Sequence, residues 1–175
     1  MFTATEAYTR HIGRYGEALA DAHLQAAGVA PGQRALDVGC GPGALTAVLA
    51  EALGAENVAA VDPSEPFVTA CRRRVPGADV RGAPAEELPD FGTRFDLVSS
   101  QLVVNFMTDA RAGVSEMTAQ ARPGATVASV VWDYVDGVQL LRAFWDAALE
   151  LDPGAPERSA HHGLGDAGRA ASVVA

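Results

Sequence analysis

The stretch LDVGCGPG, residues 36–43, decides the fold. It completes a short apolar run over residues 35–38 and leads, through three glycines at alternate positions, into an alanine- and leucine-rich segment over residues 44–53. The run predicts a buried strand and the segment predicts a helix that ends at Gly54. Glycine lets the backbone turn sharply and approach a ligand, because no Cβ stands in the way. The stretch therefore indicates a strand, a tight turn and a helix, with a ligand at the end of the strand.

The same alternation of strands and helices continues along the chain. Further strands are expected over residues 57–61, 78–81, 94–99 and 125–132, and further helices over residues 65–74, 109–121 and 138–151. Residues 5–27 carry apolar side chains at helical spacing, with Gly28 placed to end that helix. Strands that alternate with helices predict an α/β fold with a doubly wound, mainly parallel sheet.

Two features of the first half suggest what the turn binds. The amino-terminal end of the helix over residues 44–53 offers free N–H groups and a partial positive charge, which suit a carboxylate. Asp62 follows the second expected strand, where a carboxylate can accept hydrogen bonds from ribose hydroxyls. Asp62 has a second interpretation, because an acidic residue before Pro63 and Ser64 can simply cap the next helix.

The glycine spacing separates two cofactor classes. Dinucleotide-binding turns have the pattern G-x-G-x-x-G, whereas Gly39, Gly41 and Gly43 form G-x-G-x-G. The spacing favours another adenosine-containing cofactor. It weighs against a nicotinamide-dependent oxidoreductase, which remains an alternative.

Charge and composition exclude several other classes. The net charge of −9 argues against a nucleic-acid partner, which clustered basic residues would bind. All 13 basic residues are arginine, so lysine Schiff-base chemistry and a Walker-type phosphate loop are excluded. Cys40 and Cys71 lack the companions of a zinc site, as does the pair His161 and His162, and we expect no metal.

The first residues, the apolar runs and the thiols of the chain suggest where in the cell the protein resides. The first ten residues contain no apolar segment of the kind found in signal peptides, and no apolar run is long enough to cross a membrane. We expect a cytoplasmic protein with free thiols and no membrane partner.

Together these motifs closely resemble class I, Rossmann-like methyltransferases that use S-adenosylmethionine, of the small-molecule type that includes a ubiquinone- and menaquinone-biosynthesis-like group. The resemblance covers about residues 8–151 and rests on LDVGCGPG, on AVDPSEPF from residue 60, on the segment over residues 82–109 and on RPGATVASVVWDY from residue 122. It implies a sheet order of 3-2-1-4-5, S-adenosylmethionine as cofactor and a small-molecule methyl acceptor. The cofactor-binding residues that it implies are Asp37, Gly39, Cys40, Gly41, Gly43, Asp62, Pro63, Ser64, Ala85, Glu86, Ser100, Gln101 and Leu102.

The chain departs from the family at three places. Pro84 stands where many relatives carry an acidic residue that contacts the adenine amine, and Ala125 replaces a usual second glycine. The family also continues past residue 151 with an antiparallel pair that completes a seven-stranded sheet. Here residues 152–175 have no periodicity and predict an irregular or disordered tail. We therefore expect a domain over residues 1–151, with residues 1–30 as a helical lid, that lacks the last two strands.

Methyl transfer to a small molecule is the resulting functional hypothesis, and a truncated cofactor-binding remnant with little activity is the alternative. No general base stands in a recognisable motif. The candidates are Tyr8, His11, Tyr15, Asp133 and Tyr134, while Asn105 and Phe106 are expected to border the acceptor. A sheet that ends at the strand over residues 125–132 would leave an apolar edge, which predicts a homodimer or aggregation.

Overall fold

The structure is a computed structural model, and it describes residues 15–132 and 139–152. These residues belong to two compact units that divide between Val130 and Val131. The second unit contains one described helix, α6 (Gln139–Leu151). The first unit contains the sheet and every described residue of the expected cofactor site.

Strands and helices of the first unit alternate as expected. After α2 (Gly16–Ala27) the chain forms β1 (Ala35–Val38), α3 (Ala44–Leu53), a short 3-10 helix η2 (Ala55–Asn57), β2 (Val58–Asp62), α4 (Glu65–Arg74), β3 (Asp79–Gly82), β4 (Phe95–Gln101), a second 3-10 helix η3 (Val104–Phe106), α5 (Ala110–Gln120) and β5 (Ala121–Val130). The described strands make one sheet in the order β3-β2-β1-β4-β5, and every pairing is parallel. The doubly wound, mainly parallel fold with order 3-2-1-4-5 is confirmed.

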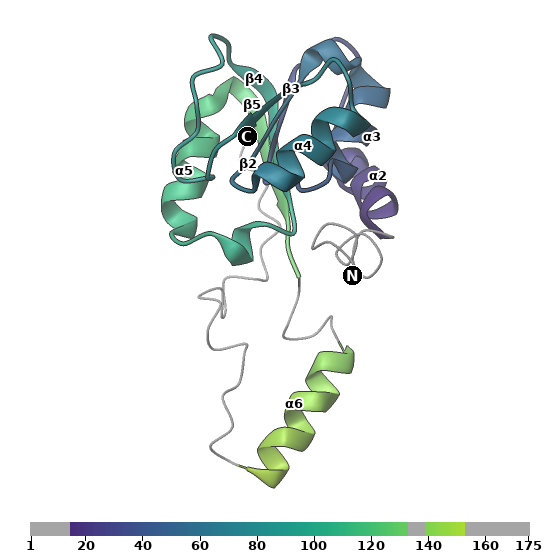
Figure 1. The fold of residues 1–175 in the computed structure, drawn as a ribbon, viewed down its shortest axis with the longest axis vertical. Helices are drawn as coiled ribbons and strands as arrows, with labels where there is room; N and C mark the ends of the chain where they lie inside the picture. The colour runs from purple at the N-terminus through teal and green to yellow at the C-terminus, as the bar shows by residue number, and fades with distance from the viewer. Residues whose placement is uncertain (1–14, 133–138, 153–175) are drawn as a thin grey trace. The chain divides into compact units, whose positions relative to one another are not determined.

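Helices cover both faces of the sheet, with α5 on one side and α2, α3 and α4 on the other (Figure 1). Each face buries a core of its own. On one face α2 and α3 pack against the sheet through a cluster that includes Leu24, Leu49 and Leu97. On the other face α5 packs through Met117 against Leu36 and other strand residues. Consecutive residues of β1 enter opposite cores, because side chains alternate along a strand. All four β1 residues are buried, as expected for the central strand of a parallel sheet.

The strand order creates a switch point beside β1. The chain leaves β1 toward β2, whereas β4 pairs on the other side of β1, with Asp37 opposite Ser99. The carboxyl ends of β1, β2 and β4 therefore meet at one edge of the sheet. Ligands of open α/β sheets bind outside this edge at such a point.

The predicted boundaries agree best near the glycine turn. The strand over 35–38 and the helices over 44–53 and 65–74 have the predicted bounds. Gly28 ends α2 with a left-handed φ of 70°, and an Asp109 carboxylate oxygen accepts the Ala112 N–H at the start of α5. Strands β2, β3 and β4 each begin one residue later than predicted. The predicted helix residues 5–14 and the predicted tail after residue 152, with its two histidines, lie outside the described residues.

The predicted bounds of the last strand are wrong at both ends. β5 begins at Ala121, four residues early, and ends at Val130, two residues before Trp132. Its pairing with β4 shifts register between Phe95 and Leu97, opposite residues that include Pro123 and Gly124. An edge strand with an irregularity tolerates Pro and Gly, which elsewhere mark turns. The strand therefore extends through Pro123 and Gly124 toward its amino-terminal end.

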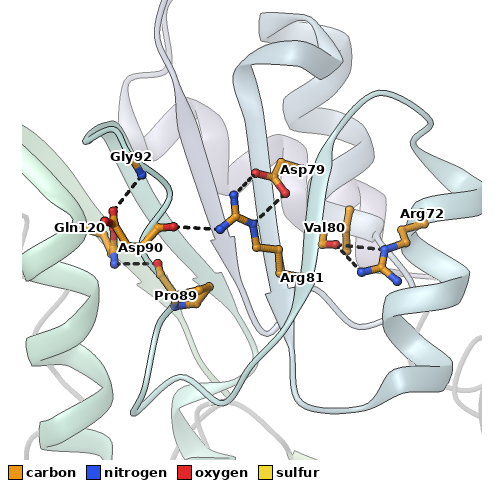
Figure 2. Close-up of polar contacts among 8 residues, drawn as sticks. All are labelled: Arg72, Asp79, Val80, Arg81, Pro89, Asp90, Gly92 and Gln120. Atoms are coloured by element: carbon orange, nitrogen blue, oxygen red, sulfur yellow. Dashed lines mark hydrogen bonds and ion pairs between the residues drawn. The ribbon is translucent and has the colours of Figure 1, made fainter.

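An arginine fixes the connection between β3 and β4 (Figure 2). The Arg81 guanidinium pairs with the Asp79 carboxylate at 2.6 Å and donates to the Asp90 carbonyl at 2.9 Å. It also lies 4.3 Å from the centroid of the Phe91 ring. These contacts hold both ends of the segment that carries Ala85 and Glu86.

Candidate functional site

The three glycines of the turn have different surroundings. Gly39, Gly41 and Gly43 all have left-handed φ angles, of 78°, 52° and 89°, which side chains rarely adopt. A Cβ on Gly39 would lie 2.5 Å from the Val103 methyl carbons, and one on Gly43 would lie 3.0 Å from the Cys71 sulfur. A Cβ on Gly41 would meet no atom within 4 Å. The outer glycines therefore permit close packing within the protein, while Gly41 faces open space that a ligand can enter.

Asp62 joins the glycine turn to the end of β2. Its Oδ2 accepts the Gly41 N–H at 2.9 Å, and its Oδ1 accepts the Ser64 N–H at 2.8 Å. Burial raises the pKa of Asp62 above its usual range, and the two hydrogen bonds oppose that effect. Ser64 occupies the N-cap position of α4, and its side chain makes no capping bond. Because each carboxylate oxygen has a further lone pair, Asp62 can still accept hydrogen bonds from a ligand.

Asp37 lies beneath the turn and is only 1% exposed. The Thr46 hydroxyl donates to its Oδ2 at 2.6 Å, whereas its Oδ1 is buried without a hydrogen-bond partner. Burial raises the pKa of Asp37 to about 7, and the charge of Asp62 adds to the effect. A buried polar atom without a partner costs free energy unless a ligand, ion or water meets it.

Cys40 and Cys71 are free and lie in one buried cluster below the turn. The Cys40 N–H donates to the Val61 carbonyl at 2.9 Å, and its own carbonyl accepts the Gly43 N–H at 2.9 Å. The Cys40 thiol donates to the Gly41 carbonyl at 3.6 Å, and the Cys71 thiol donates to the Thr46 hydroxyl at 3.5 Å. Interaction between the neighbouring thiols raises the pKa of Cys40 and lowers that of Cys71. The Cys40 side chain is thus part of the core, and only its backbone shapes the turn.

The end of β4 contains an unusual backbone conformation. Leu102 has a φ of 61° and is the one non-glycine residue with a positive φ among residues 15–132 and 139–152. Such residues cost about 1–3 kcal/mol and cluster at ligand sites. The Ser100 hydroxyl lies 2.7 Å from the Ser129 hydroxyl, and the Gln101 Nε2 donates to the Gly16 carbonyl at 3.0 Å.

Ala85 and Glu86, the two predicted cofactor residues after β3, contact the region of α5. Ala85 is buried in the core under α5. The Glu86 Oε1 accepts the N–H groups of Thr108 and Asp109, at 2.7 and 3.2 Å, where the chain enters α5. These contacts hold the Glu86 carboxylate at the start of α5. Pro84 beside them is exposed.

The residues predicted as a general base or at the border of the acceptor are only partly described by the structure. Tyr15 and Phe106 are 55% and 67% exposed, and Asn105 carries a buried Oδ1 without a partner. Tyr8, His11, Asp133 and Tyr134 lie outside the described residues.

Among the described residues no group of three or more His, Cys, Asp and Glu side chains is arranged to hold a metal ion. Within the same residues no helix is long and apolar enough to cross a membrane.

Sequence reasoning missed a buried histidine. His23 of α2 lies 2.6 Å from the Ser99 hydroxyl of β4, and burial lowers the pKa of His23. The contact joins residues 76 positions apart, so no local pattern indicates it. Thr46, the partner of Asp37, was missed as well, although its place in the first turn after Gly43 was a usable signal.

The fold and the glycine turn define a Rossmann-like methyltransferase domain. The family described as "Methyltransferase domain" matches residues 36–129, more than half of the chain, and the chain belongs to that family.

Two curated relatives support this assignment. A ubiquinone biosynthesis O-methyltransferase of Rhizobium leguminosarum bv. trifolii is 35% identical over 100 residues, which are 55% of this chain and 39% of the relative. An uncharacterized methyltransferase of Mycobacterium bovis is 36% identical over 104 residues, which are 57% of this chain and 51% of the relative. The matched part of the chain thus spans two fifths to one half of the length of these relatives.

A solved structure has the same fold. It is an amino pentose methyltransferase from Micromonospora echinaspora with bound S-adenosylmethionine, 28% identical, with a TM-score of 0.60. The match covers 78% of this chain and 59% of that chain.

The residues present fit S-adenosylmethionine. The open space at Gly41 gives the ligand an entry, and the Asp62 carboxylate beside it can accept hydroxyl groups. The buried oxygens without partners, Asp37 Oδ1 and Gln101 Oε1, are acceptors that a donor-bearing ligand would satisfy.

Proposed function

We propose that this domain binds S-adenosylmethionine and transfers its methyl group to a small-molecule acceptor. The observation that carries the proposal is the open space at Gly41, bordered by a carboxylate that is bonded to the same residue. The relatives' names agree on methyl transfer and differ in the acceptor, since one is an O-methyltransferase and one acts on an amino pentose.

Each part of the site receives a role in this proposal. The Asp62 carboxylate binds the ribose hydroxyls, and Pro63 and Ser64 lie beside the adenine together with the segment of Ala85 and Glu86. The backbone of the glycine turn and the first N–H groups of α3 hold the amino-acid carboxylate. The remaining proposed cofactor contacts come from Asp37, Gly39, Cys40, Gly43, Ser100, Gln101 and Leu102.

The chain's residues contribute orientation more than acid–base chemistry. Bound S-adenosylmethionine would supply a methyl group on a sulfonium, which leaves as a neutral thioether. The protein therefore has to align the acceptor and exclude water, which can lower a barrier by about 7–11 kcal/mol. A base is required only for an acceptor that must lose a proton. The net charge of −9 supports an acceptor other than nucleic acid.

Three further assignments belong to the proposal. Residues 1–151 form the cofactor-binding domain, with residues 1–30 as a lid, and residues 152–175 form a tail. The free thiols favour the cytoplasm. The exposed edge at β5 serves as a homodimer contact.

Calorimetric titration with S-adenosylhomocysteine and with NAD tests the proposed cofactor. We expect binding of S-adenosylhomocysteine and none of NAD, because the G-x-G-x-G turn lacks the spacing of a pyrophosphate cradle. The Gly41→Val variant is the control, since its branched side chain would enter the ligand's space. Tighter binding of NAD than of S-adenosylhomocysteine would overturn the proposal.

A further inference from the structure

The buried face of α2 contains an ionisable side chain. The buried residues of this helix are Gly16, Ala20, His23 and Leu24, and their three- and four-residue spacing places them on one face. His23 is only 8% exposed, and its Nε2 lies 2.6 Å from the Ser99 hydroxyl of β4. An imidazole therefore occupies a position at the contact between helix and sheet where an apolar side chain is usual.

The surroundings of His23 offer no counter-charge to a proton on its ring. Asp37 of β1 is the acidic residue that the sheet places on the same face, because it pairs in register with Ser99. Its pKa of about 7 leaves Asp37 mostly neutral at the acidic pH at which a histidine takes up a proton. The other charged side chains of the elements around α2 are exposed or paired elsewhere, namely Glu17 with Arg74 of α4, Asp21 of α2, Glu51 of α3, and Asp96 of β4 with Arg122 of β5.

The helix α2 can separate from the sheet without breaking a strand pairing. It precedes β1, lies outside the sheet beside α3, and takes no part in the order β3-β2-β1-β4-β5 (Figure 1). Its buried contribution to the core is small, because it consists of Ala20 and Leu24, with Ala27 packed at the border. Elements with few buried apolar contacts open locally at a lower free energy than the central strands of a sheet.

The start of α2 borders the end of the glycine turn. A Cβ placed on Gly16 would lie 2.9 Å from the Cβ of Ala44, the first residue of α3. The next residue, Glu17, pairs with Arg74, whose Cδ would lie 3.4 Å from a Cβ on Gly43. Separation of α2 would therefore uncover the place where the glycine turn enters α3.

We infer that α2 is an acid-sensitive cover of the glycine turn, which separates from the sheet when His23 takes up a proton. The role of the turn as a cofactor site rests on the proposed function, whereas the separation of α2 does not depend on it. An imidazolium between α2 and β4 would lose its hydration without gaining a counter-charge, so it is more stable on a separated helix that exposes it to water.

The direction of the pH effect follows from the same burial. Burial lowers the pKa of His23 below its usual value of 6.5. The separated helix therefore binds a proton at a pH at which the docked helix does not. Docking of α2 is fully favoured above about pH 6.5 and is lost progressively as the pH falls.

Amide hydrogen exchange of α2 tests the inference at about pH 5.5 and about pH 7.5, on either side of the usual pKa of histidine. Rates are corrected for intrinsic exchange at each pH, and β1 is the internal reference. The double variant His23→Leu with Ser99→Ala removes the titrating ring and leaves no buried hydroxyl without a partner. Adding Ala22→His to it is the matched control, because this histidine lies on the exposed face of the same helix. His23→Gln is a second non-titrating variant, and its amide can still bond Ser99.

We expect opening of α2 in the parent to increase about ten-fold from the higher to the lower pH, as for one proton bound only by the separated helix. Exchange of β1 should not increase, because the buried Asp37 favours the folded sheet at the lower pH. Both non-titrating variants should lose the increase, and Ala22→His should not restore it. Saturating S-adenosylhomocysteine should slow exchange of α2, because the proposed site lies beneath its start.

Several results would overturn the inference. If α2 of the parent exchanges equally at both pH values, protonation of His23 does not release it. If the non-titrating variants keep the increase, another group is responsible. An equal increase in β1 would show unfolding of the whole sheet. If bound S-adenosylhomocysteine leaves exchange of α2 unchanged, the helix does not cover the site. Failure of the parent to bind S-adenosylhomocysteine in a calorimetric titration would instead refute the proposed function, and the pH comparison would still decide whether His23 releases α2.

Discussion

At the scale of single residues, two carboxyl groups near the glycine turn are buried, although carboxyl groups are usually exposed to water. Asp37 is almost fully buried and has one hydrogen-bond donor for its two oxygens. Asp62 is nearly as buried but accepts two backbone N–H groups. The two carboxyl groups therefore differ in their surroundings: Asp62 is held beside Gly41 by two backbone N–H groups, whereas Asp37 has one oxygen without a partner.

We expect the Asp37→Asn variant to change the pH dependence of stability. Asp37 has a pKa of about 7 in the folded protein, above its usual value of 3.8, because burial disfavours its charged form. Between these values the unfolded chain binds fewer protons, so the parent loses stability as pH rises, by about 1.4 kcal/mol for each pH unit. The variant should lack this loss, which thermal unfolding at pH 5 and pH 8 measures.

Asp96→Asn is the control for that experiment, because Asp96 should contribute a pH dependence of stability opposite in sign to that of Asp37. The Arg34 N–H and the Arg122 guanidinium lower the pKa of Asp96, so its stabilising effect is lost as pH falls. A parent and an Asp37→Asn variant with parallel stability curves from pH 4 to pH 8 would contradict the role given to Asp37.

We expect Asp62→Ala to weaken binding of S-adenosylhomocysteine by about 1.5–3 kcal/mol, the range for hydrogen bonds to a charged group. The change also leaves the Gly41 N–H without its acceptor, which loosens the turn. Asp96→Ala is the matched control, because Asp96 also accepts a backbone N–H, that of Arg34 at 2.8 Å, but lies at the amino-terminal end of β4, away from the proposed ribose contact. Calorimetric titration with S-adenosylhomocysteine measures the affinity of both variants. If Asp62→Ala binds as tightly as the control, the ribose contact lies elsewhere.

At the scale of elements, the local sequence pattern predicts those helices and strands whose ends are fixed by neighbouring residues. β1, α3 and α4 were predicted residue for residue, because Gly, Pro and apolar runs mark their ends. β5 was not, because its first residues are extended only through pairing with β4. The site divides in the same way. The turn and Asp62 follow from spacing, whereas the orientation of Gln101 and the contacts of Glu86 depend on residues 85 and 22 positions away.

The contact of Glu86 with the start of α5 predicts a change in stability. We expect Glu86→Ala to lower the free energy of unfolding by about 1 kcal/mol, because the Thr108 and Asp109 N–H groups lose their acceptor. The neighbouring Glu87→Ala variant should change it by less than about 0.5 kcal/mol, as for an exposed surface position. Urea unfolding of the two variants measures the difference. Equal effects would mean that Glu86 does not stabilise the entry to α5.

At the scale of the whole molecule, the described sheet has a long strand at one edge. β5 has ten residues, pairs only with β4 within the sheet, and is half-buried or exposed along its length. Strands of this kind tend to pair with another chain. The stretch Thr126–Val130 contains no charged side chain that would oppose such pairing.

We expect the protein to associate with itself through this edge. Sedimentation velocity should show a species larger than the monomer that increases with concentration. Thr126→Lys should shift the distribution toward the monomer, because a lysine on an edge strand opposes pairing. A parent that sediments as a monomer at all concentrations and unfolds cooperatively would contradict the prediction.

The central place of β1 has a consequence for synthesis on the ribosome. β1 can pair with β2 once residue 62 has left the exit tunnel, but its second neighbour, β4, is complete only at residue 101. Until then one side of a fully buried strand has no partner, and parallel pairings over such separations form slowly. The nascent chain therefore passes through an interval in which β1 and β2 are exposed to misassembly. A pause in translation before residue 101 has left the tunnel would lengthen that interval, whereas a later pause would not.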